Sequence, residues 1–200
     1  MRKNHYQKTK YLLNAPSGRF LPEDSGIEVV FAGRSNAGKS SVLNTLVRQK
    51  GLARTSKTPG RTQELVCFEI DEKRRLIDLP GYGFAKVPEA KKLAWAKSLD
   101  EYFQTRQSLR GLVLIMDVRH PMKPDDEQML QWCQYQKLPV RIILNKADKL
   151  SRGAASSQLQ MIRNMLTENE SVQLFSALKK TGVEELIEQL DNWFESESEE

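Results

Sequence analysis

The chain has 200 residues, of which 39% are hydrophobic and 28% charged, a composition typical of one globular domain with its own core. No apolar run approaches the roughly 20 residues that cross a bilayer, and the first residues lack the apolar stretch of a secretory signal. We therefore expect a cytoplasmic protein without a membrane span. Cys67 and Cys133 are isolated in the sequence, which argues against a disulfide framework or a zinc site and predicts two buried thiols.

The formal net charge of +5 conceals an uneven arrangement of charge. Eight of the 26 acidic side chains lie in residues 184–200, which contain no Lys or Arg, so residues 1–183 carry a net charge of +13. Basic residues concentrate in residues 1–20 and 48–61, and neither stretch contains an acidic residue. This arrangement favours a polyphosphate partner such as nucleic acid, although a solvated basic surface explains it equally well.

Short β-rich runs alternate with amphipathic helical patterns along the chain. Strands are predicted at residues 27–32, 65–70, 76–79, 112–116, 140–144 and 172–175. Three of these runs are almost continuously apolar, as expected for parallel strands that are covered on both faces. The alternation predicts an α/β fold in which a six-stranded, mostly parallel sheet carries helices on both faces. Residues 24–194 form this domain, with a basic extension at 1–23 and an acidic, disordered tail at 195–200.

Two helical patterns are the clearest. Between residues 88 and 106, one predicted face carries four apolar side chains, namely Leu93, Ala96, Leu99 and Phe103. The last helix buries Val183, Leu186, Ile187, Leu190, Trp193 and Phe194. Thr181 and Glu184 are spaced as a capping box at its start.

A phosphate-binding motif follows directly after the first predicted strand. Its eight residues match the pattern G-x-x-x-x-G-K-S/T between a strand and a helix: Gly33, Arg34, Ser35, Asn36, Ala37, Gly38, Lys39 and Ser40. The glycines let backbone N–H groups turn toward an anion, Lys39 reaches the β- and γ-phosphates, and the Ser40 hydroxyl ligates Mg²⁺. The motif predicts nucleotide binding but fits ATPases, kinases and GTPases equally.

The base is indicated by a segment after the strand at 140–144, which consists of Asn145, Lys146, Ala147 and Asp148. The carboxylate of Asp148 can accept hydrogen bonds from N1–H and the exocyclic amine of guanine, whereas adenine offers neither donor there. A helix-capping Asp is the alternative explanation. Ser176, Ala177 and Leu178 follow the last strand and could offer backbone N–H groups to guanine O6, which is a weak signal alone.

Two further segments could approach the γ-phosphate. Asp78, Leu79, Pro80 and Gly81 form a D-x-x-G string at the end of the strand at 76–79, where Asp78 would hold Mg²⁺ through water and the Gly81 N–H would meet the γ-phosphate. The string at residues 58–63 precedes it and offers Thr62 as a second Mg²⁺ ligand, with Thr58 as the competitor. Each segment also reads as an ordinary turn.

In this order the four segments identify a Ras-like GTPase, and the strings at 31–41, 58–63 and 78–83 closely resemble those of the EngB family of bacterial GTPases. The likeness extends over about residues 24–194. It implies a protein that binds GTP or GDP with Mg²⁺, acts in assembly of the large ribosomal subunit, and is linked to normal cell division and septation. The implied Mg²⁺ ligands are Ser40 and Thr62. The implied nucleotide contacts lie in residues 33–40, 78–81, 145–148 and 176–178 and at Gly60, Arg61, Thr62, Gln63 and Glu64.

The group that completes the hydrolysis site is not identified. Ras-like enzymes use a Gln after D-x-x-G to orient the attacking water, but Tyr82 stands there, so intrinsic GTP hydrolysis is expected to be slow. Arg34, Arg61 or a ribosomal arginine could supply charge, and the resemblance implies that Asn36 can ligate K⁺ beside the phosphates. A loop-shaping role for Asn36 is an equal alternative.

Two other classes of protein remain open. One is a P-loop kinase that phosphorylates a small molecule, which would need no Asp148. The other is a division-site scaffold that carries nucleotide without binding ribosomes. In the favoured interpretation we expect a monomer whose partner is ribosomal RNA or the large ribosomal subunit.

Overall fold

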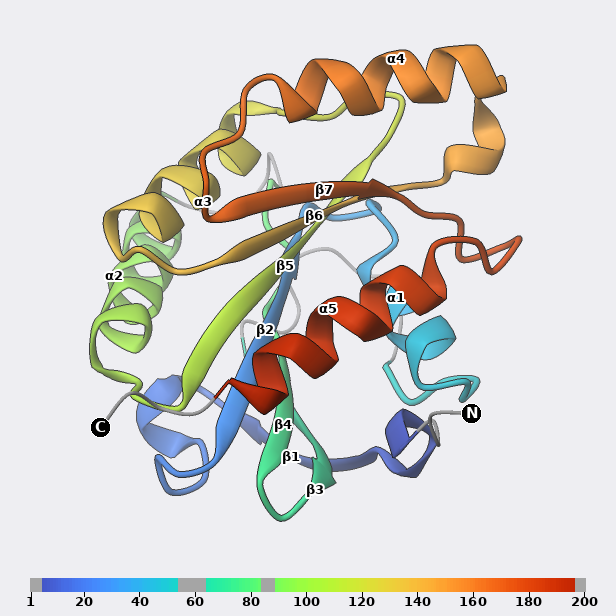
Figure 1. Ribbon diagram of the computed structural model, residues 1–200. Helices are drawn as coiled ribbons and strands as arrows, with labels where there is room; N and C mark the ends of the chain where they lie inside the picture. Colours follow the sequence, from blue (N-terminus) through green and yellow to red (C-terminus); the bar gives the residue numbers. More distant parts are fainter. Residues whose placement is uncertain (1–4, 54–63, 84–88, 197–200) are drawn as a thin grey trace.

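A seven-stranded sheet runs through the computed structural model, which describes residues 5–53, 64–83 and 89–196 (Figure 1). The strand order is β1-β3-β4-β2-β5-β6-β7. The strands are β1 (Lys10–Ala15), β2 (Ile27–Gly33), β3 (Leu65–Asp71), β4 (Arg74–Asp78), β5 (Leu109–Asp117), β6 (Val140–Asn145) and β7 (Glu170–Leu174). Strands β4, β2, β5, β6 and β7 are parallel, whereas β3 is antiparallel to both β4 and β1.

Helices cover both faces of the sheet, which confirms the predicted α/β class. The five α-helices are α1 (Lys39–Leu46), α2 (Glu89–Thr105), α3 (Pro124–Tyr135), α4 (Arg152–Arg163) and α5 (Val183–Glu195). Side chains of α2, α3 and α4 pack on one face, and side chains of α1 and α5 pack on the other. Three short 3₁₀ turns complete the described elements, at His5–Lys8, Gly18–Phe20 and Ala147–Lys149.

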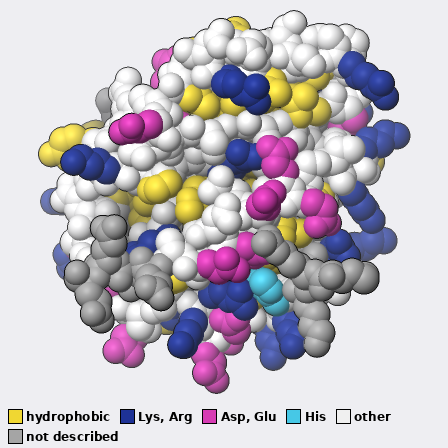
Figure 2. All heavy atoms as spheres, in the orientation of Figure 1, with side chains coloured by type: hydrophobic (Ala, Val, Ile, Leu, Met, Phe, Trp, Pro, Cys, Tyr) yellow, Lys and Arg dark blue, Asp and Glu magenta, His cyan; other side chains and the backbone are white. Residues whose placement is uncertain are grey.

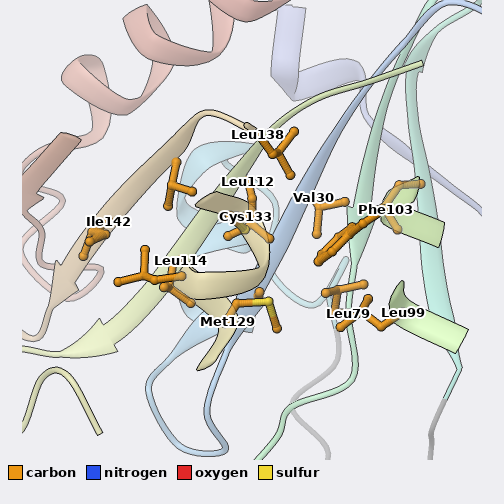
Figure 3. Packing of buried hydrophobic residues seen from close by; sticks show 14 of the residues in the cluster. Val30, Leu79, Leu99, Phe103, Leu112, Leu114, Met129, Cys133, Leu138 and Ile142 are labelled. Atoms are coloured by element: carbon orange, nitrogen blue, oxygen red, sulfur yellow. The ribbon is translucent and has the colours of Figure 1, made fainter. Parts of the chain in front are cut away.

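The core between the sheet and α2 and α3 is built from aliphatic side chains of the central strands. Figure 3 shows Leu112 and Leu114 of β5 facing Met129 and Cys133 of α3, while Val30 of β2 lies near Phe103. Apolar side chains of β2, β5 and β6 are buried on both faces, as the almost continuously apolar runs predicted. Cys67 and Cys133 are buried and free, as expected.

The number of strands differs from the expected six because β1 adds a seventh. It lies within the segment interpreted as a basic extension and pairs antiparallel with β3 at the edge of the sheet. Only Ala15 of β1 is buried, so the strand lacks the alternation of buried and exposed side chains that reveals a half-buried strand. Strand β1 therefore joins the sheet through backbone pairing with β3, and its side-chain pattern does not predict this.

Two expectations about helices are wrong in detail. The first residue of the predicted α2 face, Leu93, is 66% exposed, and Tyr102 is buried beside Leu99 and Phe103 instead. The capping box at α5 does not form, because Gly182 is the N-cap residue, with a φ of 79° and no side-chain cap. Thr181 instead exchanges two backbone hydrogen bonds with Ser176. A left-handed glycine turn thus begins α5 where a side-chain cap was expected.

A buried ionic network lies at the amino-terminal end of β2. Glu28 has no exposed surface and accepts hydrogen bonds from the Arg106 guanidinium at 2.7 and 3.0 Å and from the Tyr102 hydroxyl at 3.2 Å. The Arg75 Nε atom of β4 lies 3.1 Å from the same carboxylate. The network therefore joins β2, β4 and the end of α2, and it also raises the pKa of Tyr102, through burial first and the Glu28 charge second.

Acidic side chains are clustered over one part of the surface. Figure 2 shows several Asp and Glu side chains close together over α5, whereas Lys and Arg side chains are spread over this face and its edges, with further Asp and Glu side chains at the lower edge. Among the described helices, none combines the length and the apolar character that crossing a bilayer demands.

Candidate nucleotide-binding site

Four of the predicted segments meet at the carboxyl ends of the parallel strands. Residues 33–38 begin at the last residue of β2, residues 78–81 at the last residue of β4 and residues 145–148 at the last residue of β6, and residues 176–178 come shortly after β7. The strand registers align these ends, since Phe31 pairs with Asp78 and Asp117 with Asn145. This edge is where open α/β sheets bind ligands, because loops there leave the sheet in opposite directions.

The loop at residues 33–38 is shaped by two glycines that no other residue could replace without displacement. A Cβ atom at Gly38 would lie 2.3 Å from Asn145 Nδ2, and the φ of Gly38 is 97°. A Cβ atom at Gly33 would lie 2.7 Å from the carbonyl oxygen of Ile115. Gly38 is also the N-cap of α1, so the first N–H groups of the helix and the positive end of the α1 dipole lie at this loop. The loop and the helix can together receive an anion.

Lys39 and Asp78 form an ion pair beneath this loop. Both side chains are only 11% exposed, and the Lys39 ammonium donates to the Asp78 carboxylate. Burial raises the pKa of Asp78 while the Lys39 charge opposes that rise. The pair places one cation and one carboxylate where the phosphates and their metal ion were expected.

Mg²⁺ fits the donors at this position. Ser40 is the second residue of α1 and follows Lys39, and Asp78 ends β4, so this position carries a hydroxyl and a carboxylate, which are the kind of hard oxygen donor that Mg²⁺ prefers. In the described ranges no group of three or more His, Cys, Asp or Glu side chains could hold a metal ion. A Mg²⁺ ion here would owe most of its coordination to phosphate oxygens and water, which is its usual mode in nucleotide sites.

The segments expected to recognise the base are tied to the phosphate loop by Asn145. Its buried side chain donates from Nδ2 to the Ala37 carbonyl at 3.0 Å and accepts the Ala177 N–H at Oδ1 over 3.4 Å. One amide thus joins residues 33–38 to residues 176–178. Asp148 lies in the 3₁₀ turn after β6 and accepts the Ser176 hydroxyl, and this hydrogen bond lowers the pKa of Asp148 below its usual value. Asp148 is therefore a carboxylate at neutral pH, as acceptance from guanine requires. Leu178 is exposed.

Tyr82 does not face the phosphate loop with its hydroxyl. The ring is buried in the core under α3, and the hydroxyl donates to Asp126 at 3.0 Å. The Tyr82 backbone continues the loop contact, since its carbonyl accepts the Ser35 N–H at 2.9 Å. Burial first and the Asp126 charge second raise the pKa of Tyr82 well above its ordinary value. The side chain anchors the segment after Gly81 rather than orienting water.

Other predicted residues lie at the margin of the described site. The Arg34 guanidinium is directed toward α3, where Nε lies 3.8 Å from Asp125. Asn36 is exposed and has a φ of 66°. This left-handed conformation is the one expected if Asn36 shapes the loop, which was the alternative to K⁺ ligation. Glu64 accepts a hydrogen bond from Asn14 of β1 at 3.0 Å. Residues 58–63, including Gly60, Arg61, Thr62 and Gln63, lie outside the described residues.

One residue of this edge, Asp117 at the end of β5, was not predicted from the sequence. Its carboxylate binds the Lys146 ammonium at 2.9 Å. A signal existed, because Asp117 ends an apolar strand in the same way as Asp78 ends β4. It was missed because no phosphate or base motif contains it.

The chain is similar in sequence to known GTP-binding proteins. Residues 28–146 match the family described as 50S ribosome-binding GTPases, and residues 99–196 match the elongation factor Tu GTP-binding domain. The chain is 55% identical to the probable GTP-binding protein EngB of Pasteurella multocida, covering 96% of this chain and 95% of that protein. It is 56% identical to the probable GTP-binding protein EngB of Salmonella newport, covering 95% and 92% of the two chains.

Solved structures resemble the fold as a whole. The crystal structure of a probable GTP-binding protein engB covers 84% of this chain, and 98% of its own, with a TM-score of 0.68 and 21% identity. Era in complex with MgGDPNP and nucleotides 1506–1542 of 16S ribosomal RNA covers 87% of this chain and 58% of its own, with a TM-score of 0.65 and 20% identity. At these identities the likeness establishes the fold.

Proposed function

Because this chain belongs to the EngB family of GTP-binding proteins and is a GTPase, we propose that it is a nucleotide switch in assembly of the large ribosomal subunit, needed for normal cell division and septation. It acts as a cytoplasmic monomer. The description of the matching family as 50S ribosome-binding GTPases supports the ribosomal role, as does the net charge of +13 on residues 1–183. The solved Era complex illustrates that a protein of this fold can hold ribosomal RNA.

The geometry of the carboxyl edge supports the proposed nucleotide roles. Residues 33–38 and the start of α1 cradle the phosphates, and Lys39 turns from Asp78 toward the β- and γ-oxygens. Asp148 and the N–H groups of residues 176–178 read guanine. The Asn145 amide supports this arrangement, because it joins Ala37 and Ala177 and so fixes the distance between phosphates and base. It is the observation that carries the assignment.

Ser40 and Thr62 would hold Mg²⁺, and Asp78 would bind it through water. The bound ion would neutralise charge that develops on the phosphates during hydrolysis. The protein's own part is to position the γ-phosphate between Lys39 and the Gly81 N–H. The buried Tyr82 supports the expectation of slow intrinsic turnover, since its hydroxyl is bound to Asp126.

A potassium ion at Asn36 would raise this slow turnover. Asn36 is exposed at the crown of the loop, so its side chain is accessible to an ion beside the phosphates. Turnover is measured in KCl and in NaCl at equal ionic strength, for the wild type and for Asn36→Ala. A higher rate in KCl that the substitution abolishes is expected. Equal rates in both salts for both proteins would remove the ion from the mechanism.

Sedimentation with purified ribosomal subunits tests the ribosomal role. The chain is expected to sediment with large subunits in a non-hydrolysable GTP analogue and to remain in the supernatant with GDP. Asp148→Asn is the matched variant. It is expected to sediment with large subunits in a xanthine nucleotide analogue rather than in a guanine one, which would show that docking depends on the bound nucleotide. Absence of nucleotide-dependent sedimentation would favour the scaffold. Competition of binding by ATP as well as by GTP would favour a small-molecule kinase.

A further inference from the structure

Asp117 lies outside the four segments assigned to the nucleotide, yet it touches one of them directly. It ends β5 and pairs in register with Asn145, the first residue of the base-recognition segment. Its Oδ2 atom accepts a hydrogen bond from Lys146 at 2.9 Å. The two side chains are 17% and 28% exposed, so the pair is largely withdrawn from water.

Lys146 connects Asp117 to the phosphate loop. The same ammonium that binds Asp117 donates to the backbone carbonyl of Asn36 at 2.6 Å. Lys146 and Asn36 have φ values of 64° and 66°, in the left-handed region that side-chain-bearing residues seldom occupy. Such conformations persist only where surrounding contacts hold them. The Lys146 ammonium provides such a contact between the two residues.

The other contacts of Asp117 reinforce its position. Arg119 donates to it from Nε at 2.9 Å and from a terminal nitrogen at 2.7 Å, a bidentate pair on the outer side of the carboxylate. Burial opposes ionisation of Asp117, but the hydrogen bonds from Arg119 and Lys146 prevail and hold its pKa well below the usual range. Asp117 is therefore a carboxylate at neutral pH, the form that accepts the Lys146 hydrogen bond.

We propose that Asp117 is a positioning residue that holds Lys146 across the phosphate loop and thereby sets how long a bound guanine nucleotide stays. The inference rests on the assignment of residues 33–38 and 145–148 to phosphates and base. Because the Lys146 ammonium binds both Asp117 and the Asn36 carbonyl, the base segment is joined to the phosphate loop before the nucleotide binds. Without Asp117, Lys146 becomes free to leave the Asn36 carbonyl, and the loop opens more readily around bound ligand. The effect belongs to the dissociation rate, because pre-organised contacts act mainly there.

The test is the release of a fluorescent GDP analogue, chased with excess GDP, from the wild type and from Asp117→Asn. The nearly isosteric amide removes the charge that holds Lys146, so release is expected to become about tenfold faster or more. Release of a GTP analogue is expected to accelerate by a similar factor. The preference for GDP over XDP is expected to be unchanged, because Asp148 is untouched.

Two matched variants separate this role from general destabilisation. Asp71→Asn removes a carboxylate that pairs with Arg74 at the β3–β4 turn, at the opposite end of the sheet, and is expected to leave release unchanged. Arg119→Gln removes the outer partner while leaving the Asp117 and Lys146 pair, and is expected to change release less than Asp117→Asn. Asp117→Glu displaces the carboxylate from Lys146, so its release rate is expected to lie between those of the wild type and Asp117→Asn.

A double-mutant cycle with Lys146→Met decides whether Asp117 acts through Lys146. Adding Asp117→Asn to Lys146→Met is expected to accelerate release no further. The proposal would be overturned if Asp117→Asn or Asp117→Glu released nucleotide at the wild-type rate. It would also be overturned if the acceleration in the double variant equalled the product of the accelerations in Asp117→Asn and Lys146→Met. A wild-type chain that binds ADP as well as GDP would instead overturn the assignment of the base segment, which is a distinguishable failure.

Discussion

At the scale of single residues, the type and spacing of the candidate site residues were predictable, but many of their partners were not. The string ending at Asp148 predicted a carboxylate after β6, and that carboxylate is held by Ser176. Tyr82 was recognised as a departure from the Gln of Ras-like enzymes, yet its burial under α3 and its bond to Asp126 depend on packing between segments 44 residues apart. Partners of this kind are set by the fold and leave no local pattern.

Replacing Asp148 with Asn is expected to exchange guanine for xanthine selectivity. An amide presents a donor to the exocyclic amine of guanine, so GTP affinity is expected to fall about 100-fold or more. The 2-oxo group of xanthine accepts that donor, so affinity for XTP is expected to rise. Competition binding with both nucleotides measures the exchange. Retained GTP affinity without a gain for XTP would contradict the assignment of the base pocket.

Tyr82→Phe is expected to lower stability without slowing hydrolysis. The substitution removes a hydrogen bond to the buried Asp126, which costs about 1 kcal/mol of unfolding free energy. GTP turnover is expected to stay within about twofold, because the hydroxyl is turned toward α3. Urea denaturation and turnover are measured beside Tyr135→Phe, whose side chain is 81% exposed and whose stability is expected to be unchanged. A loss of turnover in Tyr82→Phe alone would place its hydroxyl in the reaction.

At the scale of elements, strands covered on both faces were the most predictable, and edges and helix starts the least. The runs at β2, β5 and β6 are apolar because helices pack on both sides, so the sequence records their burial directly. Strand β1 has one free edge and side chains that are mostly exposed, so its sequence has no apolar run that would predict a strand. The orientation of α2 was misjudged at Leu93 because Tyr102 turns inward to reach Glu28.

The junction between α2 and β5 is expected to weaken in acid through Asp24. Its carboxylate accepts the backbone N–H groups of Gln107 and Ser108 at 2.8 and 2.9 Å. Burial alone would raise the pKa of Asp24, but these hydrogen bonds lower it below its usual value. Because the folded pKa lies below the unfolded one, the stabilisation is present above the unfolded pKa and is lost as the pH falls through the folded pKa.

Asp24→Asn is therefore expected to cost about 1 kcal/mol of unfolding free energy at neutral pH, and less as the wild-type carboxyl becomes protonated. Chemical denaturation between neutral pH and about pH 3 follows the difference between the two proteins. Glu72→Gln, on an exposed turn, is the matched control and is expected to show no such convergence. A constant difference at every pH would assign the loss to packing rather than to charge.

At the scale of the whole molecule, the uneven distribution of charge bears on the proposed contact with RNA. Acidic side chains gather over α5, while residues 1–20 and 48–61 are free of acid. Residues 54–63 lie outside the described residues, so the second stretch rests on sequence. It ends next to Thr62, which is expected to contact Mg²⁺, and GTP would thereby fix the presentation of Arg54 and Lys57.

The GTP form is accordingly expected to bind large subunits more tightly than the GDP form, with an affinity that falls steeply with salt. Changing Arg54 and Lys57 together to Ala is expected to reduce the slope of log affinity against log salt concentration by about one to two. The reason is that the variant neutralises fewer phosphates and so releases fewer counterions on binding. Lys8 and Lys10 changed together to Ala provide the comparison within residues 1–20. Equal affinities in the two nucleotide states would refute the switch. A salt slope reduced only by the Lys8 and Lys10 changes would move the RNA contact to the first twenty residues.

The enclosure of Glu28 constrains how this sequence can diverge. Two guanidinium groups, Arg75 and Arg106, converge on a carboxylate that has no contact with solvent. Losing Glu28 alone leaves two like charges buried together, which costs about 3 to 5 kcal/mol and approaches the whole stability of a small domain. During evolution these charged residues can therefore be replaced only by nearly simultaneous substitutions. Otherwise, substitutions elsewhere must first make the fold stable enough to tolerate the loss of one charge. We expect the three positions to be inherited as one unit, each amino acid dependent on the other two.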